Sequence, residues 1–140
     1  MNRTPDWERD LNDFISKSRQ EPFKWGQNDC CLFAANAVLA VTGYDLAEDF
    51  RGKYTTGQGA LKCLADHGVR DVAELLELFQ SSVVQPQFVA FAQRGDLMLY
   101  DLGARLGPAV GVCIGQDSAF VGLEGLQFIP TLSCSKSWRV

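Results

Sequence analysis

The stretch DCCLFAANAVLAVTG, residues 29–43, decides how the rest of the chain folds. Asp29 is a residue type that caps helix N-termini, and Gly43 is the type that often follows a helix C-terminus. Between them, residues 30–42 are apolar on nearly every side of a helix. A helix that is apolar all round belongs in the middle of a domain. The sequence therefore predicts a central helix over 30–42, beginning at Cys30.

The segment before this run predicts an amphipathic helix over residues 4–18. It opens with Thr4-Pro5-Asp6, which supplies an N-cap, a first-turn proline and an acid at the positive end of the helix dipole. Apolar side chains then recur on one face, at Trp7, Leu11, Phe14 and Ile15. Glu21-Pro22 ends this element, and a loop with two aromatic side chains is expected over 23–28.

The segment after the central run predicts two short helices. One covers 60–67, with Leu61 and Leu64 facing inward, and the other covers 72–79 and is capped by Asp71. Residues 44–59 are expected to form a loop or a short helix, because Gly and Thr are frequent there. The pattern over 83–91 is ambiguous and includes a proline.

The C-terminal part predicts antiparallel strands, because short apolar runs alternate with Gly-containing turns. The expected strands are 97–100, 109–114, 119–121 and 126–129, with a last edge strand over 137–140. Helices followed by antiparallel strands give the α+β pattern. We expect one domain over 1–140: an N-terminal helix in 1–22, a helical part in 23–93 and a β-meander in 94–140, with the cysteine-bearing helix packed on the sheet.

Length and charge exclude several classes of protein. A chain of 140 residues holds one domain with a real core. Basic and acidic residues number 9 and 10 in the first half and 4 and 7 in the second, so neither half is basic. We therefore expect no nucleic-acid partner. The apolar runs are shorter than about 18 residues, and none follows the basic residue near the N-terminus, so we expect neither membrane insertion nor a secretory signal.

Five cysteines and one histidine bound the chemistry of the protein. An odd number of cysteines cannot form a complete disulfide framework, and we expect free thiols in a reducing cytosol, with secretion by another route or packaging into a particle left open. Cys30 is the candidate catalytic nucleophile, because a helix N-terminus stabilises a thiolate. The alternative is a small buried residue at a tight helix start.

A metal site has weaker support in the sequence. Cys63 and His67 lie four residues apart on one helix, which supplies only half of a tetrahedral zinc site. Cys30 and Cys31 would point different ways on a helix, which disfavours a joint site. We therefore expect no metal and no cofactor.

The order of several motifs resembles a known family of enzymes. NlpC/P60 papain-like cysteine peptidases show the same order as Asp29-Cys30, Gly95-Asp96-Leu97-Met98-Leu99-Tyr100 and Val110-Gly111-Val112-Cys113-Ile114-Gly115. Over residues 23–140 the chain more closely resembles small phage and prophage tail proteins of that fold. That likeness lies in Phe23-x-Trp25-Gly26-x-x-Asp29-Cys30, Gly43 with Asp45, Phe50-Arg51-Gly52-x-Tyr54, Gly125-Leu126 and Trp138-Arg139-Val140.

The chain departs from the peptidases where their catalytic base should be. The resemblance puts the histidine base at Ala109, and the polar residue that orients it at Ala119 or Phe120; none of these can accept a proton. A thiol without a base loses the assistance that makes it a catalyst. His67 would have to approach from a helix, and the dipole at the helix C-terminus is the simpler reason for its position.

The resemblance implies a phage tail component near the tail tip or hub, acting as a pseudoenzyme. Its partners would be other tail proteins, and it would be assembled into the virion tail in the bacterial host cytoplasm. Cleft or docking candidates beside the vestigial Cys30 are Trp25, Gly26, Asp29, Arg51 and Tyr54. A core or anchor role is the commoner one for an aromatic residue such as Trp25, and a plain turn explains Arg51-Gly52-x-Tyr54 equally well. The alternative function is an active cysteine hydrolase of the cell wall that uses Cys30 with a non-standard base. A host protein binding a small ligand in a vestigial cleft is a third alternative.

Overall fold

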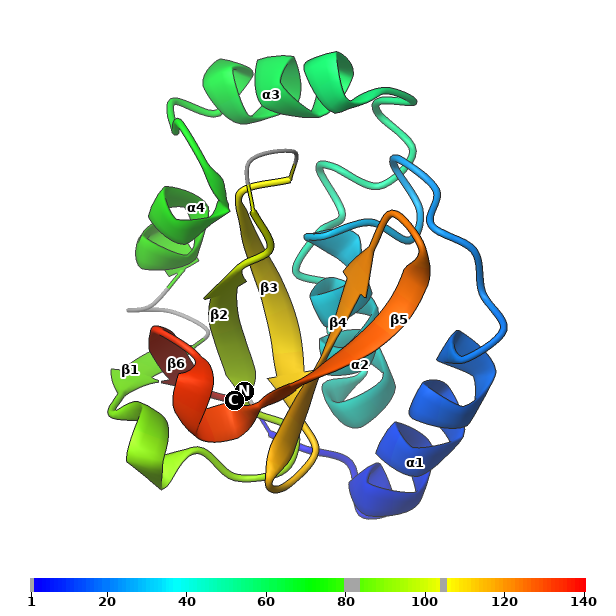
Figure 1. Cartoon of the computed structure of the whole chain (residues 1–140), viewed down its shortest axis with the longest axis vertical. Coiled ribbons are helices and arrows are strands. Elements are labelled where there is room, and N and C mark those ends of the chain that lie inside the picture. Colours follow the sequence, from blue (N-terminus) through cyan, green and yellow to red (C-terminus); the bar gives the residue numbers. More distant parts are fainter. Residues whose placement is uncertain (1, 80–83, 104–105) are drawn as a thin grey trace.

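The central helix lies against a twisted antiparallel sheet, in a computed structural model that describes residues 2–79, 84–103 and 106–140 (Figure 1). Within those ranges the helices are α1 (Trp7–Ser18), α2 (Leu32–Thr42), α3 (Gly57–Asp66) and α4 (Val72–Phe79). The strands are β1 (Gln85–Gln87), β2 (Leu97–Asp101), β3 (Pro108–Cys113), β4 (Asp117–Gly122), β5 (Gly125–Pro130) and β6 (Lys136–Arg139). Two 3-10 turns complete the fold, η1 (Val89–Phe91) and η2 (Thr131–Ser133). The α+β class is therefore confirmed.

The strand order is β1-β6-β2-β3-β4-β5, and every pair is antiparallel. Strands β2 to β5 form the expected meander. The last strand was expected at an edge, and this is wrong: β6 lies inside the sheet, between β1 and β2. Trp138 stands opposite Leu97 on β2 and Pro86 on β1, and its buried indole packs into the core.

The ambiguous segment contributes the edge strand β1 and the turn η1, while its first residue, 83, lies outside the described residues. Pro86 in β1 is compatible with an edge position, where one side of the strand needs no ladder hydrogen bond. Because β1 precedes residue 94, the sheet also takes a strand from the part expected to be helical. Residues 104–105 of the turn expected over 101–108 also lie outside the described residues.

Three helices begin at residues other than those expected. Helix α1 begins at Trp7, after Asp6 in the N-cap position, rather than at residue 4. Helix α2 begins at Leu32 rather than Cys30. Helix α3 begins three residues early, because the Thr56 side chain caps it by accepting a hydrogen bond from the Gly59 N–H at 3.0 Å.

Helix α4 has the predicted bounds, and the Asp71 carboxylate caps it by accepting from the Glu74 N–H at 2.9 Å. In α3 the inward position expected for Leu61 is wrong, since that side chain is 62% exposed. Helix α3 instead packs on the core through other residues, among them Leu64, as expected. Figure 1 shows α3 across one end of the strands. None of its side chains is fully buried, whereas most of those of α2 are.

The central strands β2, β3 and β4 are buried on both faces along most of their length. One face carries Leu97, Leu99, Val110, Val112 and Val121, which pack against α1, α2 and α4. The other face carries Met98, Ala109, Cys113 and Phe120, which pack against Cys30 and residues around η1 and η2. Burial on both faces accounts for strands with nearly continuous apolar sequence.

None of the described helices combines the length and the apolar character needed to cross a membrane.

Two glycines on neighbouring strands offer a matched test of this packing. A Cβ on Gly111 of β3 would lie 2.2 Å from the Ala119 carbonyl oxygen and 2.7 Å from the Phe120 ring, whereas one on Gly122 of β4 would meet only the flexible end of Gln127. We expect Gly111→Ala to lower the free energy of unfolding by about 2–3 kcal/mol or more, because the Ala119 carbonyl belongs to the backbone of the paired strand and cannot move away from the new methyl group. Gly122→Ala should cost less than about 1 kcal/mol. Urea denaturation measures both, and equal losses would contradict the described packing.

Candidate functional site

The carboxylate of Asp29 organises the start of α2, although Asp29 is completely buried. Its Oδ1 accepts hydrogen bonds from the backbone N–H groups of Cys31 at 3.0 Å and Leu32 at 2.9 Å. Its Oδ2 accepts from the Gly26 N–H at 2.9 Å and from the Tyr54 hydroxyl at 2.6 Å. Cys31 occupies the N-cap position, so Asp29 caps the helix from two residues further upstream than expected.

Gly26 and Tyr54, both docking candidates, belong to the same arrangement. Gly26 has φ +82°, and a Cβ there would lie 2.1 Å from the Tyr54 carbonyl oxygen, so only glycine allows this approach. Burial, followed by the charge of Asp29, raises the pKa of the Tyr54 hydroxyl far above its usual range. Tyr54 therefore stays protonated and donates its hydrogen bond to Asp29 throughout the physiological pH range.

Cys30 lies beside this carboxylate and faces the sheet. Its backbone oxygen accepts a hydrogen bond from the Val110 N–H of β3 at 2.8 Å, and the residue is 7% exposed. Cys30 was expected inside the first helical turn; it instead precedes α2 by two residues, because the chain bends there to meet β3. Trp25 packs against the same cluster, and its role in a cleft stays a prediction.

Ala109 and Phe120 are members of the apolar cluster that contains Cys30. These are two of the positions at which the resemblance implies a base and its orienting residue. Ala119, the other candidate for the orienting position, packs with α1 and α2 on the opposite face. Neither Ala109 nor Phe120 carries a nitrogen or oxygen in its side chain that could accept the proton of the Cys30 thiol.

Cys30 and Cys31 bring their side chains together. Both sulfurs and a carboxylate oxygen of Asp29 lie within 4.8 Å of one another. The expectation that the two side chains diverge assumed a helix, but neither residue lies within α2. Hydrogen bonding to Cys30, followed by burial, raises the pKa of the Cys31 thiol well above its ordinary value, so Cys31 is protonated at neutral pH.

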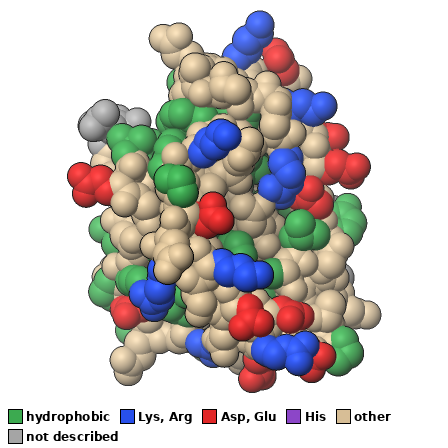
Figure 2. Space-filling model, turned by 90° about the vertical axis from the view of Figure 1, so that its right-hand side faces the viewer, with side chains coloured by type: hydrophobic (Ala, Val, Ile, Leu, Met, Phe, Trp, Pro, Cys, Tyr) green, Lys and Arg blue, Asp and Glu red, His purple; other side chains and the backbone are tan. Residues whose placement is uncertain are grey.

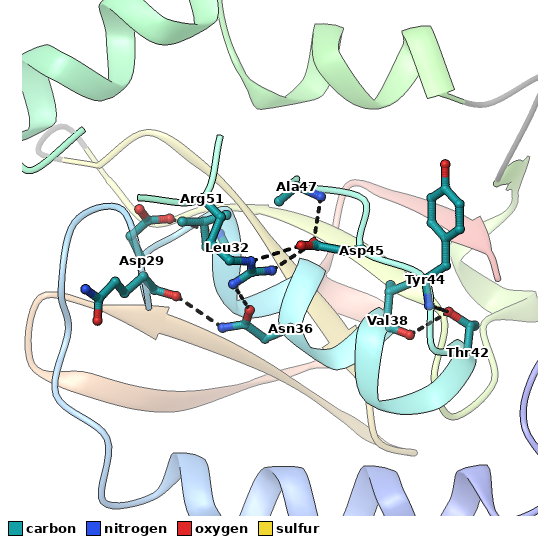
Figure 3. A network of polar contacts seen from close by, with 10 residues as sticks. Asp29, Leu32, Asn36, Val38, Thr42, Tyr44, Asp45, Ala47 and Arg51 are labelled. Atoms are coloured by element: carbon teal, nitrogen blue, oxygen red, sulfur yellow. Dashed lines mark hydrogen bonds and ion pairs between the residues drawn. The ribbon is translucent and has the colours of Figure 1, made fainter. Parts of the chain in front are cut away.

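Arg51, the remaining docking candidate, is held within the molecule (Figure 3). Its Nε and Nη2 donate to the two carboxylate oxygens of Asp45 at 3.1 and 2.9 Å, and its Nη1 donates to Asn36 of α2. The hydrogen bond from Arg51 lowers the pKa of Asp45. This network fastens the loop after α2 onto the helix, so a docking role for Arg51 stays a prediction.

The His67 side chain contacts the backbone of its own helix and a neighbouring aromatic ring. The Nδ1 of His67 lies 2.8 Å from the backbone oxygen of Cys63, and the imidazole stacks on Phe50 with ring centroids 4.3 Å apart. Within the described ranges, the one group of three potential metal ligands with converging atoms is Asp29, Cys30 and Cys31.

A second buried carboxylate, Asp96, was not singled out from the sequence as a site residue. Its Oδ1 accepts from the Arg3 guanidinium at 2.9 Å and the Val140 N–H at 3.2 Å. Its Oδ2 accepts from the Gln87 side chain at 2.8 Å and the Gln93 N–H at 2.9 Å. The Gly95-Asp96 pair before β2 was a visible sequence signal for this residue. The hydrogen-bond partners of Asp96 lie in distant segments of the chain, so the sequence alone could not identify them.

Surface charge gives no sign of a cationic binding face on the side shown in Figure 2. Lys and Arg side chains there are interspersed with Asp and Glu. The formal net charge of the chain is −4. Attraction of a nucleic-acid backbone needs clustered positive charge, which this face does not have.

Replacing Asp29 should strongly destabilise the domain. Asp29→Ala leaves three N–H groups and a hydroxyl without their acceptor, and we expect a loss of at least about 3 kcal/mol of unfolding free energy. Tyr54→Phe removes one of the four hydrogen bonds and should cost about 1–2 kcal/mol. Asp13→Ala, at an exposed position of α1, is the control. Equal stability of Asp29→Ala and Asp13→Ala in urea denaturation would contradict the role of the carboxylate.

Alkylation should report the raised pKa of Cys31. With iodoacetamide, modification of Cys31 in the folded protein should be slow at neutral pH and should still accelerate above about pH 9, where an ordinary thiol is mostly ionised. Fragment-ion mapping separates Cys31 from Cys30, and protein unfolded in guanidinium provides the reference rates. A rate that levels off below about pH 8 would contradict the assigned direction.

Comparison with known proteins gives a family for the whole domain. A family model described as a domain of unknown function, DUF6950, matches residues 2–140. This range contains α2, both buried carboxylates and every strand of the sheet. A search of curated proteins finds no match. Because the family model covers nearly the entire chain, the protein belongs to the DUF6950 family.

Proposed function

We propose that the protein is a non-catalytic assembly component of a phage tail, built on a papain-like, NlpC/P60-like fold. Its motifs resemble those of small tail proteins over residues 23–140, and the α+β arrangement with a cysteine beside the central helix fits that resemblance. Its role is to contact other tail proteins near the tail tip or hub. Its place is the virion tail, assembled in the bacterial host cytoplasm.

The observation that carries the non-catalytic part of the proposal is the apolar setting of Cys30. A cysteine hydrolase needs a proton acceptor within hydrogen-bond reach of its thiol. Cys30 packs instead with Ala109 and Phe120, and the nearby Asp29 carboxylate already accepts four hydrogen bonds. The single histidine, His67, contacts Phe50 and the Cys63 carbonyl at the end of α3.

Exposed apolar side chains support an assembly role. Phe88 is 76% exposed, Phe91 is 66% exposed and Leu132 is 77% exposed. The turns η1 and η2, which carry or flank these residues, contact each other. Large apolar side chains gathered at a surface are typical of protein–protein contacts. We call Phe88, Phe91 and Leu132 the turn patch and assign it to contact with a tail protein.

Phage particles carrying variants of this chain test the proposal. We expect the wild-type chain to purify with tails and Cys30→Ala to be incorporated normally, because the thiol has no catalytic task. The double variant Phe88→Asp/Phe91→Asp should reduce incorporation by about tenfold or more, because each substitution removes an aromatic anchor. Leu61→Asp, at another exposed apolar side chain, should be incorporated like the wild type.

Two results would overturn the proposal. One is recovery of the protein only from soluble host fractions while tails assemble without it. The other is cleavage of peptidoglycan peptides by the purified wild type but not by Cys30→Ala, which would establish the cysteine hydrolase instead. Circular dichroism of each purified variant shows that a loss of incorporation does not come from unfolding.

A further inference from the structure

Cys30 and Cys31 form a pair of thiols for which the proposed function has no use. Their sulfurs lie within 4.8 Å of each other and of a carboxylate oxygen of Asp29. The Asp29 carboxylate already accepts four hydrogen bonds, which occupies the acceptor positions that a carboxylate offers. The two sulfurs are therefore the atoms of this group that can bind something else.

The backbone around the pair disfavours a direct disulfide. Adjacent Cα atoms are about 3.8 Å apart across a trans peptide, whereas disulfides usually join Cα atoms about 4.4–6.8 Å apart. The Cys31 N–H is held by Asp29 and the Cys30 oxygen by Val110. Closing an S–S bond would disturb these hydrogen bonds, but one atom placed between the sulfurs can bind both while the backbone stays in place.

Charge and coordination number limit what that atom can be. Zinc in structural sites takes four protein ligands, and this group offers two. A monovalent soft cation held by two thiolates would leave a net negative charge beside the buried Asp29 carboxylate, which is costly away from water. A trivalent arsenic atom bound to two thiolates and one organic group is neutral.

We propose that Cys30 and Cys31 form a bidentate dithiol site for trivalent arsenicals of the type R–As(OH)2. Two S–As bonds form and two As–O bonds break, and each hydroxyl leaves with a thiol proton as water. Arsenic stays trivalent, so the step needs no oxidant or reductant. The product is a ring closed by arsenic across the two side chains.

The surroundings of Cys31 allow an arsenical to reach the thiol pair and offer an apolar surface for its organic group. Cys31 is partly exposed, whereas Cys30 is buried, so Cys31 reacts first and ring closure by Cys30 follows within the bound molecule. Cys31 also lines an apolar cavity of about 60 Å³, together with Leu32, Ala35 and Phe50. An apolar group on arsenic can lie against this surface.

Phenylarsine oxide, which hydrates to this type of arsenical, tests the site in the full-length folded protein. We expect one phenylarsenic group per chain, seen by native mass spectrometry as the group added with loss of two hydrogens. The adduct should survive excess monothiol and be released by a small dithiol. Cys30→Ser and Cys31→Ser should each weaken binding by about 10²–10⁴-fold, because either change turns a two-point attachment into one. Cys63→Ser, at another partly exposed thiol, should bind like the wild type.

A protection experiment on the wild type keeps the test decisive even where a serine variant does not fold. Under conditions long enough to modify Cys31 in the free protein, N-ethylmaleimide should modify Cys63 but spare Cys30 and Cys31 once the arsenical has bound, as read from fragment ions. Modification of both residues of the pair in the bound protein would overturn the proposal, as would tight binding that survives Cys31→Ser but not Cys63→Ser. These readouts are independent of tail incorporation, so the dithiol site can fail while the proposed function stands.

Discussion

The structure depends on placing one buried charge, the Asp29 carboxylate, where four donors meet it. A carboxylate away from water is tolerable only when its oxygens are fully hydrogen-bonded. The four donors come from three segments: the loop at Gly26, the first residues around α2, and the end of the following loop at Tyr54. Satisfying one group thus ties these segments together and presses Cys30 toward β3. The geometry of the thiol pair is a by-product of that requirement.

Much of the fold could be predicted because its signals are local. The apolar run between Asp29 and Gly43 favours an interior helix, and short apolar runs between glycine turns favour strands. The interior position of β6 could not be predicted, because strand order depends on pairing between residues far apart in the sequence. The start of α3 was missed for a smaller reason: a Thr56 hydroxyl outweighed the poor helix propensity of two glycines.

The candidate site was also predictable only in part. The residues that could be predicted were those marked by a pattern of neighbouring residues in the sequence. Asp29 and Cys30 stand out because a capping residue precedes an apolar helix. The convergence of Cys30 and Cys31 could not be foreseen, because it arises from two non-helical residues just upstream of α2. Arg51 and Tyr54 looked like surface groups, since their partners Asp45, Asn36 and Asp29 are identified only once the loop folds back.

Asp96 has a topological consequence. One carboxylate oxygen receives both Arg3 and Val140, so the two ends of the described chain meet at a single atom, as Figure 1 also shows. A short flexible linker could therefore join the ends, and new ends could be opened in a surface turn without altering the strand order. By the same geometry, the whole domain could be inserted into a loop of another protein with little strain at the junctions.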